Sequence, residues 1–520
     1  MGYNGQVSGR IRALTLAVAA LAALTVLVYP FTVARYPAIT DLPFHAAQVS
    51  IFRHYADPAF HFAEQFELHP FDVPYLTMYA LGALAAFAVP IHVAAKVMAV
   101  GMLALLPLGL GLLFHGMKKS PLWGVLGLAF AYTDLTHWGF LSFVGALGLY
   151  AASIGLTLRL LDAPSPRKQL ALGAVLLLLF FTHVYRFPYA LLAIGLTALV
   201  MYPATRQVKP LFLPLGPPVA LFAVWFLSRP PTLSGGVPLA FDASRAARLG
   251  DFVFGNYVGA SGAEEKKLAG AMLATVAAAL VLALVYRDRE RAADARERRF
   301  RQGVTLLPLL LAGGHLLAYF TLPARVGEWW YVFPRELPAA WFILLGALPD
   351  LPQRRSVQLG IVALIGLGSG RMALFVAERW RAFERETADF REIAANLPPA
   401  PKLAYLVIDH GLPGKAGEKR HSALVHLPAW IQAERGGWLS FHFAGWRIFP
   451  IWYRTGAADT PPQVPRDWEW NPSWFRVNEQ GRFFDWFLVR LADDPAPIFA
   501  SDPGVQLVER RGSWWLYRRP

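Results

Sequence analysis

The chain has 520 residues, of which 55% are hydrophobic and only 16% are charged. Soluble globular proteins carry about a quarter charged residues, so this composition argues against a soluble protein. The formal net charge of +14 lies largely in short loops between apolar segments, which the positive-inside rule explains without a nucleic-acid partner. Cysteine is absent, and no P-loop or Rossmann glycine pattern occurs. These absences exclude a disulfide framework and argue against an ATP-driven machine or a nucleotide-cofactor enzyme.

Apolar runs of about 20 residues, enough to cross about 30 Å of hydrocarbon, recur along the first three quarters of the chain. They predict an α-helical polytopic membrane protein with about eleven spans. The first run is long and lacks a small-residue cleavage site, so we interpret it as a retained signal anchor. The predicted spans are 11–34, 91–115, 121–133, 138–161, 169–185, 187–202, 211–228, 268–286, 303–322, 334–350 and 356–376.

Basic residues in the short loops predict the orientation of these spans. Arg10 and Arg12 precede the first span, so we expect a cytoplasmic N-terminus in a bacterial-type inner membrane. The same rule places further basic loops in the cytoplasm: Lys118-Lys119, Arg167-Lys168, Arg206 with Lys209, the cluster 287–302, and Arg354-Arg355. The loops that hold Asp134, Arg186, 229–267 and 323–333 then lie outside, as does the C-terminal region.

One apolar segment, 73–90, does not fit this scheme as a span. Counting it would move Lys118 to the outer side and invert every later loop. The segment is bracketed by Pro74 and Pro90 and offers about 15 uninterrupted residues, fewer than a span requires. We therefore predict a juxtamembrane or re-entrant helix, and treat 35–90 as one long external loop.

Hydropathy falls after residue 379, which predicts a membrane module at 1–379 and a small extracytoplasmic α/β domain at 380–520. "KLAYLVID", "DWFLVRL", "VQLVER" and "SWWLYRR" have the composition of strands, and "HLPAWIQAER" favours a helix. Arg511-Gly512 indicates a hairpin between the last two strands. This region holds many tryptophans, for which we favour packing in a core or at an interface over sugar stacking. They are Trp430, Trp438, Trp446, Trp452, Trp468, Trp470, Trp474, Trp486, Trp514 and Trp515.

Polar residues follow closely on the first span in "RYPAITDLPFHAAQ". If "DLPFHAAQ" is helical, with Pro43 in its first turn, then Asp41 and His45 lie on one face. A carboxylate held there can act as a general base. It can equally be a helix N-cap, and both interpretations stay open at this point.

The order of these features resembles the GT-C superfamily of membrane glycosyltransferases. A first span leads into a long external loop with an early Asp, and a second external loop, "AYTDLTHWGFLSF", carries another. The resemblance implies that Asp41 and Asp134 are the catalytic acidic positions, with His45 and His137 as candidate substrate-binding neighbours. No D-x-D or E-x-D follows Asp41. No cofactor is therefore expected, although a His/carboxylate pair can bind a divalent metal.

Cationic residues near the predicted outer ends of spans suit an anionic lipid-linked donor. His183 and Arg186 lie in "FFTHVYRFPY", and Arg325 and Arg335 flank "VGEWWYVFPRE". Arginine offers bidentate hydrogen bonds to a phosphate. The alternative is an interfacial aromatic belt with snorkelling arginines.

The resemblance implies a hexosyl- or pentosyltransferase in the lipid bilayer. It would move a sugar from a polyprenyl-phosphate donor to a glycan, lipid or protein acceptor of the cell envelope, with Asp41 as general base. A non-catalytic envelope-assembly protein on the same scaffold is the alternative. A transporter fits less well, because ionisable residues cluster at span ends and not at mid-membrane.

Overall fold

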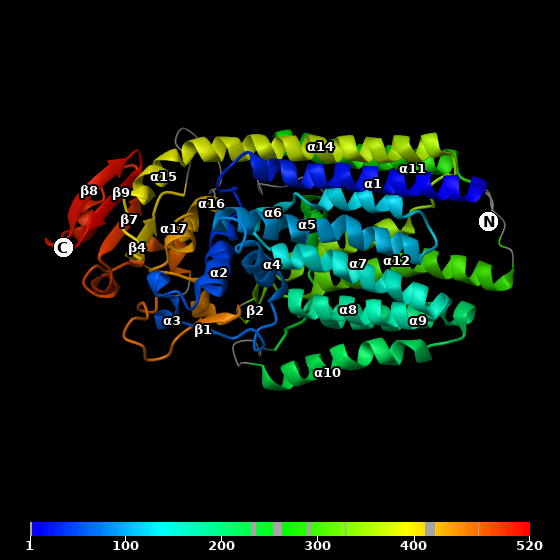
Figure 1. Ribbon diagram of the computed structural model, residues 1–520, viewed down its shortest axis with the longest axis horizontal. Helices are drawn as coiled ribbons and strands as arrows, with labels where there is room; N and C mark the ends of the chain where they lie inside the picture. Colours follow the sequence, from blue (N-terminus) through cyan, green and yellow to red (C-terminus); the bar gives the residue numbers. More distant parts are fainter. Residues whose placement is uncertain are drawn as a thin grey trace. The chain divides into compact units, whose positions relative to one another are not determined.

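The computed structural model describes residues 3–229, 236–252, 263–288, 292, 294–327, 329–410, 422–465 and 467–520. The chain forms two compact units (Figure 1). The membrane unit comprises Met1–Pro30, Val100–Thr136 and Leu141–Val376. The α/β unit comprises Phe31–Ala99, His137–Phe140 and Ala377–Pro520, so the loop 35–90 is grouped with the C-terminal region.

The helices of the membrane unit follow the predicted spans closely. Eight helices of the described chain are long and apolar enough to cross a membrane, which confirms the predicted helical membrane protein. The long helices, of which all but α8 count among these eight, are α1 (Tyr3–Thr32), α5 (Ile91–Gly116), α7 (Leu141–Asp162), α8 (Pro166–Thr182), α9 (Arg186–Thr205), α10 (Phe212–Ser228), α11 (Ala263–Val285), α12 (Ala295–Thr321) and α14 (Arg355–Glu386). Shorter elements are η2 (Pro121–Phe130), α6 (Asp134–Trp138), η3 (Lys209–Leu211), η5 (Ala243–Phe252), β2 (Arg325–Val326), β3 (Trp329–Trp330), η6 (Phe333–Arg335), α13 (Glu336–Leu344) and η7 (Leu345–Ala347).

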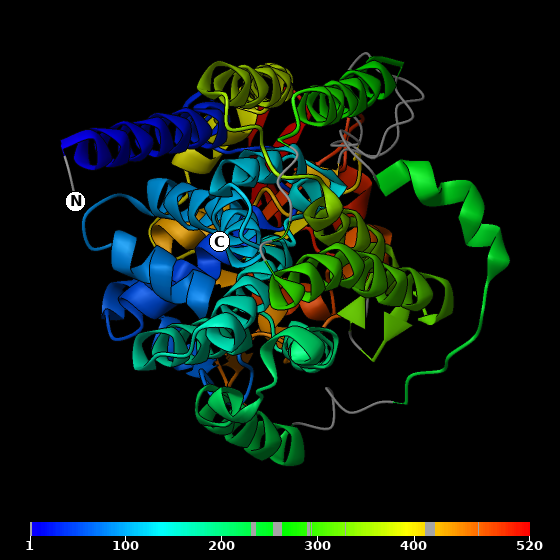
Figure 2. The ribbon, with the colours of Figure 1, turned by 90° about the vertical axis from the view of Figure 1, so that its right-hand side faces the viewer.

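Helix α7 is the most enclosed helix of this unit. It packs against α8 and α9, and α9 packs against α12, as the end-on view of these helices shows (Figure 2). In the most apolar 18-residue stretch of α7, 89% of the residues are buried, whereas in that of α11 only 17% are buried. The exposed apolar surface of α11 suits hydrocarbon, because a helix hydrophobic all round needs either a protein or a lipid environment.

Glycines bring α5 and α7 into close contact. A Cβ added at Gly109 would lie 1.9 Å from the carbonyl oxygen of Gly148, and one at Gly116 would lie 2.3 Å from that of Gly155. Both pairs are seven residues apart on their helices, so they fall on one face. Small residues at such a seam let two backbones approach and pack in a membrane.

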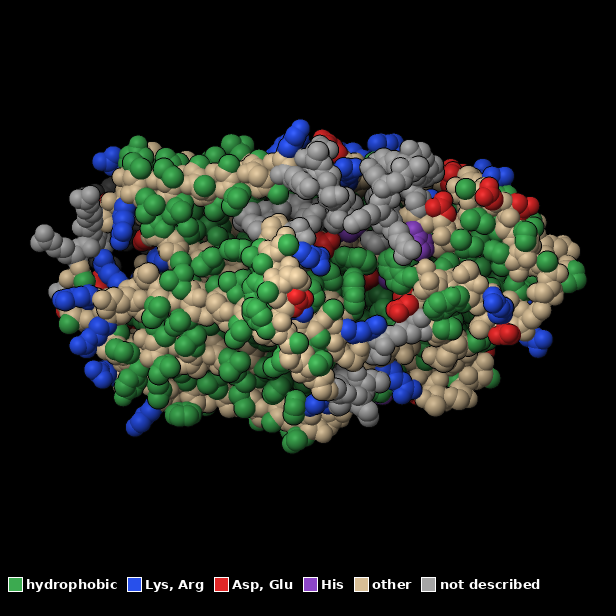
Figure 3. Space-filling model, turned by 180° about the vertical axis from the view of Figure 1, so that it is seen from behind, with side chains coloured by type: hydrophobic (Ala, Val, Ile, Leu, Met, Phe, Trp, Pro, Cys, Tyr) green, Lys and Arg blue, Asp and Glu red, His purple; other side chains and the backbone are tan. Residues whose placement is uncertain are grey.

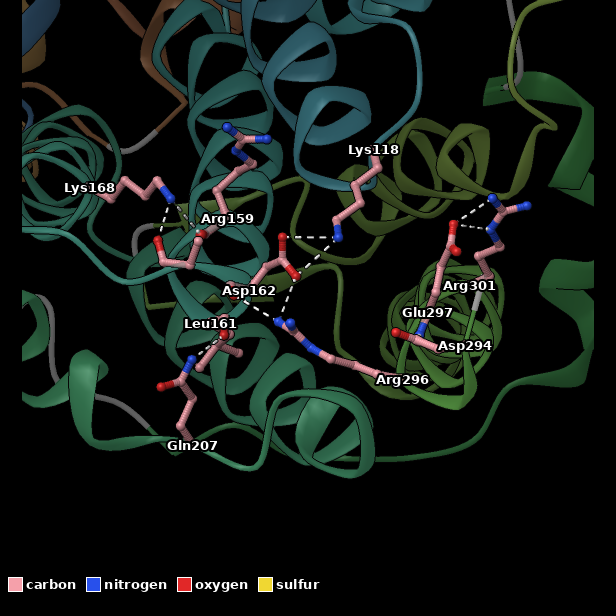
Figure 4. A network of polar contacts seen from close by, with 11 residues as sticks. Lys118, Arg159, Leu161, Asp162, Lys168, Gln207, Asp294, Arg296, Glu297 and Arg301 are labelled. Carbon is pink, nitrogen blue, oxygen red and sulfur yellow. Dashed lines mark hydrogen bonds and ion pairs between the residues drawn. The ribbon is translucent and has the colours of Figure 1, made fainter. Parts of the chain in front are cut away.

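The basic loops predicted to share one side of the membrane meet at one end of this unit (Figure 4). Asp162 accepts hydrogen bonds from Lys118 at 3.0 Å and from Arg296 at 3.1 Å. Gln207 donates to the carbonyl oxygen of Leu161 beside them. Lys and Arg gather at an end of the helices that are otherwise covered by hydrophobic side chains (Figure 3). The structure therefore places the loops after α5, α7 and α9 and before α12 on one side.

Two of the predicted spans, 121–133 and 334–350, form shorter helical elements than expected but still extend from one end of the membrane unit to the other. Helix α7, with 22 residues, covers about 33 Å and ends at Asp162 beside Lys118. The chain must cover this distance between Lys118 and Leu141. Part of this distance is covered by η2, a ten-residue 3₁₀-helix. A 3₁₀-helix rises about 2 Å per residue and so reaches further than an α-helix of the same number of residues.

The segment 334–350 makes a similar passage. Its residue Glu336 bonds to Arg186 at the start of α9, while Gln207 beyond the other end of α9 belongs to the basic end. Lys119, also at the basic end, donates to the carbonyl oxygen of Gly346 at 2.8 Å. The short elements α13 and η7 therefore connect the two ends of the unit.

The α/β unit contains a five-stranded mixed sheet of order β5-β4-β7-β9-β8. Strand β4 pairs in parallel with β5 and β7, while β9 pairs antiparallel with β7 and β8. Gly512, at φ +54°, turns the closing hairpin, as its sequence predicts. The strands are β4 (Lys402–Val407), β5 (Trp438–Leu439), β7 (Trp486–Arg490), β8 (Gln506–Arg511) and β9 (Trp514–Arg518), and the helices are α15 (Ala388–Ala395), α16 (Ser422–Val425) and α17 (Ala429–Arg435). Short 3₁₀ segments are η8 (Phe443–Trp446), η9 (Trp468–Trp470), η10 (Pro472–Trp474), η11 (Gln480–Phe483) and η12 (Ala496–Phe499).

The loop 35–90 packs into the same unit. Its elements are α2 (Leu42–His54), η1 (Pro58–Phe60), α3 (Phe62–Gln65), β1 (Phe66–Leu68) and α4 (Thr77–Ala85). Strand β1 pairs antiparallel with β6 (Ile451–Tyr453), and α2 packs against α17. A buried cluster that includes Ile51, Phe66 and Ile451 joins the two segments. Helix α4 has nine residues and spans about 14 Å, too little to cross the membrane.

Candidate functional site

Asp41 occupies the N-cap position of α2, but its carboxylate makes no capping hydrogen bond. Its Oδ1 lies 3.1 Å from Nδ1 of His426 instead. Pro43 stands in the first turn of α2, as predicted. The carboxylate is therefore directed toward a side chain of the C-terminal region, and the simple capping interpretation does not describe it.

A second segment, 137–140, holds the backbone at Asp41 in place. The amide of Thr40 donates to the carbonyl oxygen of His137 at 2.8 Å, and the amide of Asp41 donates to that of Trp138 at 3.1 Å. Gly139 has φ +95°, and a Cβ there would lie 2.7 Å from the Cβ of Asp41. Only glycine permits both this conformation and this approach. Asp41 is thus fixed between the loop 35–90 and the segment 137–140.

His45 supports the same junction from one turn further along α2. Its Nε2 lies 3.1 Å from the carbonyl oxygen of Gly139, and its Nδ1 lies 2.9 Å from the hydroxyl of Tyr79. A carbonyl oxygen can only accept, so Nε2 carries the proton and Nδ1 accepts from Tyr79. Burial lowers the pKa of His45 and keeps the ring neutral. The substrate contact predicted for His45 would require these bonds to break.

His426 and Glu469 are the polar residues near Asp41 that sequence reasoning missed. The side chain of His426 is 3% exposed and that of Asp41 is 18% exposed. Glu469 on η9 is buried and acts electrostatically on both His426 and Asp41. Burial raises the pKa of Glu469. No sequence pattern marks these residues, because His426 is 385 positions from its partner.

Aromatic rings border this cluster. Trp138 and Trp470 are both half-buried, and their ring centroids lie 6.0 Å apart. The ring centroid of Trp470 also lies 6.3 Å from that of His426. By contrast, Trp430 and Trp468 are fully buried, which agrees with the core packing expected for the tryptophans of this region.

Asp134, the other predicted catalytic carboxylate, belongs to the membrane unit. It opens α6 and accepts a 2.6 Å hydrogen bond from the hydroxyl of Tyr331. Burial raises the pKa of Asp134 to about 6, although Tyr331 and the charge of Arg248 act in the opposite direction. The prediction that Asp134 and Asp41 line one cavity with Arg335 stays a prediction.

Arg186 is committed to a buried network in the membrane unit. Its guanidinium forms two hydrogen bonds with the carboxylate of Glu336, at 2.9 and 2.5 Å. The same carboxylate lies 2.8 Å from Nδ1 of His315, whose Nε2 lies 3.2 Å from the hydroxyl of Tyr150. Since Arg186 is only 3% exposed, the network uses it to join helices. The predicted phosphate contact of Arg186 would compete with this ion pair.

The remaining cationic candidates gather near this network. Arg335 donates to the carbonyl oxygen of Trp330 at 3.0 Å and lies over the ring of Phe143. Buried His183 is affected electrostatically by both Arg335 and Arg186. Arg325 is exposed on the β2–β3 hairpin, opposite Trp330. The structure therefore brings His183, Arg186 and Arg335 together, with Arg325 on the adjoining hairpin.

Metal binding was left open by the sequence. Among the residues that the structure describes, no group of three or more His, Asp or Glu side chains is arranged to hold a metal ion. In particular, both ring nitrogens of His45 are already bonded. The expectation that no cofactor is needed stays a prediction.

Comparison with solved structures shows a fold similar to that of ArnT, which agrees with the predicted resemblance to the GT-C superfamily. The crystal structure of ArnT from Cupriavidus metallidurans in the apo state has a TM-score of 0.55 and 13% sequence identity, and the alignment covers 99% of this chain and 98% of that one. The structure of the same protein bound to undecaprenyl phosphate has 14% identity over 100% of this chain and 99% of that one, with a TM-score of 0.43. No protein-family model and no curated protein sequence matches the chain.

Proposed function

We propose that this protein is a membrane glycosyltransferase. It transfers a hexose or pentose from a polyprenyl-phosphate carrier to a hydroxyl group of an envelope glycan, lipid or protein. The observation that carries this proposal is the arrangement at Asp41. The backbone at Asp41 is held by the segment 137–140, and the carboxylate is directed away from the capping position. The GT-C fold supports the reaction class.

The reaction forms one bond and breaks one. The acceptor oxygen attacks the anomeric carbon of the sugar, and the bond between that carbon and the phosphate oxygen breaks. Polyprenyl phosphate leaves with the bonding electron pair, and the proton of the acceptor hydroxyl passes to Asp41. A positioned carboxylate of this kind raises the rate by about 10² to 10⁴.

Cations of the membrane unit would bind the donor phosphate. Arg335 and Arg325 are the candidates, because the guanidinium of Arg186 is already paired with Glu336. A guanidinium can stabilise the charge that develops on the departing phosphate. The loops that carry these residues would face the outside of a bacterial-type inner membrane, with the N-terminus in the cytoplasm and the α/β unit outside.

The test is sugar transfer by purified protein from radiolabelled polyprenyl-phosphate hexoses and pentoses to extracted envelope acceptors. Asp41→Asn should lower transfer by about 10² to 10⁴ while the melting temperature stays unchanged. Asp57→Asn is the matched control, because Asp57 caps η1 by accepting from the amide of Ala59 and has no proposed chemistry. Full transfer by the Asp41→Asn protein, or loss only through unfolding, would refute the proposal.

A further inference from the structure

Asp41 and His426 form a pair in which the histidine lies behind the carboxylate. We propose that His426 is a positioning residue for Asp41: its Nδ1–H donates to Oδ1 and leaves Oδ2 directed at the acceptor hydroxyl. The assignment rests on the proposed function of Asp41. It adds a residue of the C-terminal region, 385 positions away, to the apparatus of transfer.

Burial distinguishes the roles of the two partners. The side chain of Asp41 is 18% exposed, whereas that of His426 is 3% exposed. Substrate can therefore reach the carboxylate more readily than the ring. A histidine that acts from behind a reactive group and fixes its orientation reverses the arrangement of a serine protease triad, in which a buried aspartate fixes a histidine.

The ring of His426 is held in a defined orientation by its neighbours. Phe44 approaches its ring edge-to-face with centroids 4.8 Å apart, and Phe443 does so at 5.5 Å. Phe441 stacks on it at 6.1 Å. Packing on several sides restricts rotation of the ring, so its Nδ1 remains directed at Asp41.

Local sequence reduces competition for the carboxylate. An Asp at an N-cap normally accepts from the backbone amides of the second or third helical residue. The second residue of α2 is Pro43, which has no amide hydrogen. His426 therefore competes with fewer backbone donors for the carboxylate of Asp41.

Among the described residues, the hydrogen-bond contacts of His426 favour its role as a donor to Asp41. Asp41 precedes α2, and Glu469 lies on η9. His45 on α2 acts electrostatically on this cluster, as does Asp467, which precedes η9. Among the described residues, neither Nε2 of His426 nor Oε2 of Glu469 has a hydrogen-bond partner. The donor bond that the ring makes is therefore directed at Asp41.

Two amide substitutions separate this role from simple packing. The side-chain amide of Asn can occupy the place of Nδ1, whereas that of Gln reaches the place of Nε2. His426→Asn should keep kcat within about threefold of wild type. His426→Gln should lower kcat about 10- to 100-fold with little change in KM, because Asp41 loses its orientation and not its charge.

The assay is the same transfer reaction, with melting temperatures for each variant. Equal kcat for wild type and His426→Gln would overturn the positioning role, and so would an Asn variant as impaired as a folded Gln variant. If the Gln variant does not fold, His426→Ala with added imidazole replaces it, and failure of imidazole to restore kcat overturns the role. In each case Asp41→Asn is measured alongside. An active Asp41→Asn protein refutes the proposed function itself, whereas an inactive one confines the failure to His426.

Discussion

Replacing Glu336 by Gln should cost the membrane unit about 3 to 5 kcal/mol of unfolding free energy. Arg186 and Glu336 are 3% and 4% exposed, so neither charge is solvated by water. Gln keeps the size of the side chain and can still accept one hydrogen bond from Arg186. It cannot neutralise the guanidinium, which is then left buried without a counter-charge.

The magnitude separates an ion pair from an ordinary buried hydrogen bond. Neutral side-chain hydrogen bonds in membrane proteins contribute about 0.6 kcal/mol on average. Glu336 accepts two bonds from Arg186, at 2.9 and 2.5 Å, and lies 2.8 Å from Nδ1 of His315. Removing a buried counter-charge that serves two partners should therefore cost several times more than removing one neutral bond.

The measurement is unfolding of the purified protein in mixed micelles of rising sodium dodecyl sulfate content, followed by circular dichroism. Thr157→Val is the matched control, because Thr157 is buried in α7 and its hydroxyl makes a single bond to the carbonyl oxygen of Ser153. Adding Arg186→Met to Glu336→Gln should recover part of the loss, since the unpaired charge is then gone. A Glu336→Gln protein within about 1 kcal/mol of wild type would show that the network contributes only as neutral hydrogen bonds do.

Two further predictions concern pH and topology. The pKa of Asp134 is raised from 3.8 to about 6, so the folded state binds this proton more tightly than the unfolded state. The stability of wild type relative to Asp134→Asn should fall as pH rises from about 4 to about 6 and stay constant above that; a flat difference would contradict the burial of this carboxylate. Because the chain has no cysteine, cysteines introduced at Ser120 and Ser356 can be probed in intact cells with an impermeant thiol reagent. Both should be protected, and labelling of position 120 would refute the predicted topology.

The spans could be predicted from sequence because the hydrocarbon thickness sets a minimum apolar length. The same reasoning predicted a common side for the loops that hold Lys118 and 287–302, and Asp162 joins Lys118 to Arg296 there. Hydropathy gave no indication that 121–133 would form a ten-residue 3₁₀-helix. Such long 3₁₀-helices are uncommon. That η2 extends along the membrane unit from one end toward the other follows from the neighbouring helices.

The partner of each buried charge could not be predicted from the sequence. Arg186 and Glu336 are 150 residues apart, and an arginine near the end of a span looks the same whether it binds a phosphate or a buried carboxylate. Its pairing depends on tertiary packing, which a linear pattern does not encode. The sequence therefore indicated which cations could bind a phosphate. It did not distinguish Arg186, which is paired with Glu336, from Arg325, which is exposed.

The position of His426 shows why the first loop and the C-terminal region form one unit. Asp41 needs a backbone held by 137–140 and a side chain held by a donor. Segment 137–140 supplies the backbone bonds, but the carboxylate is contacted by His426, which lies just before α17. Since α17 packs against α2 and β6 pairs with β1, the C-terminal region fixes both the helix that Asp41 precedes and the donor that orients it. A chain that ended at residue 379 would keep the apolar spans yet lose the orientation of its proposed base.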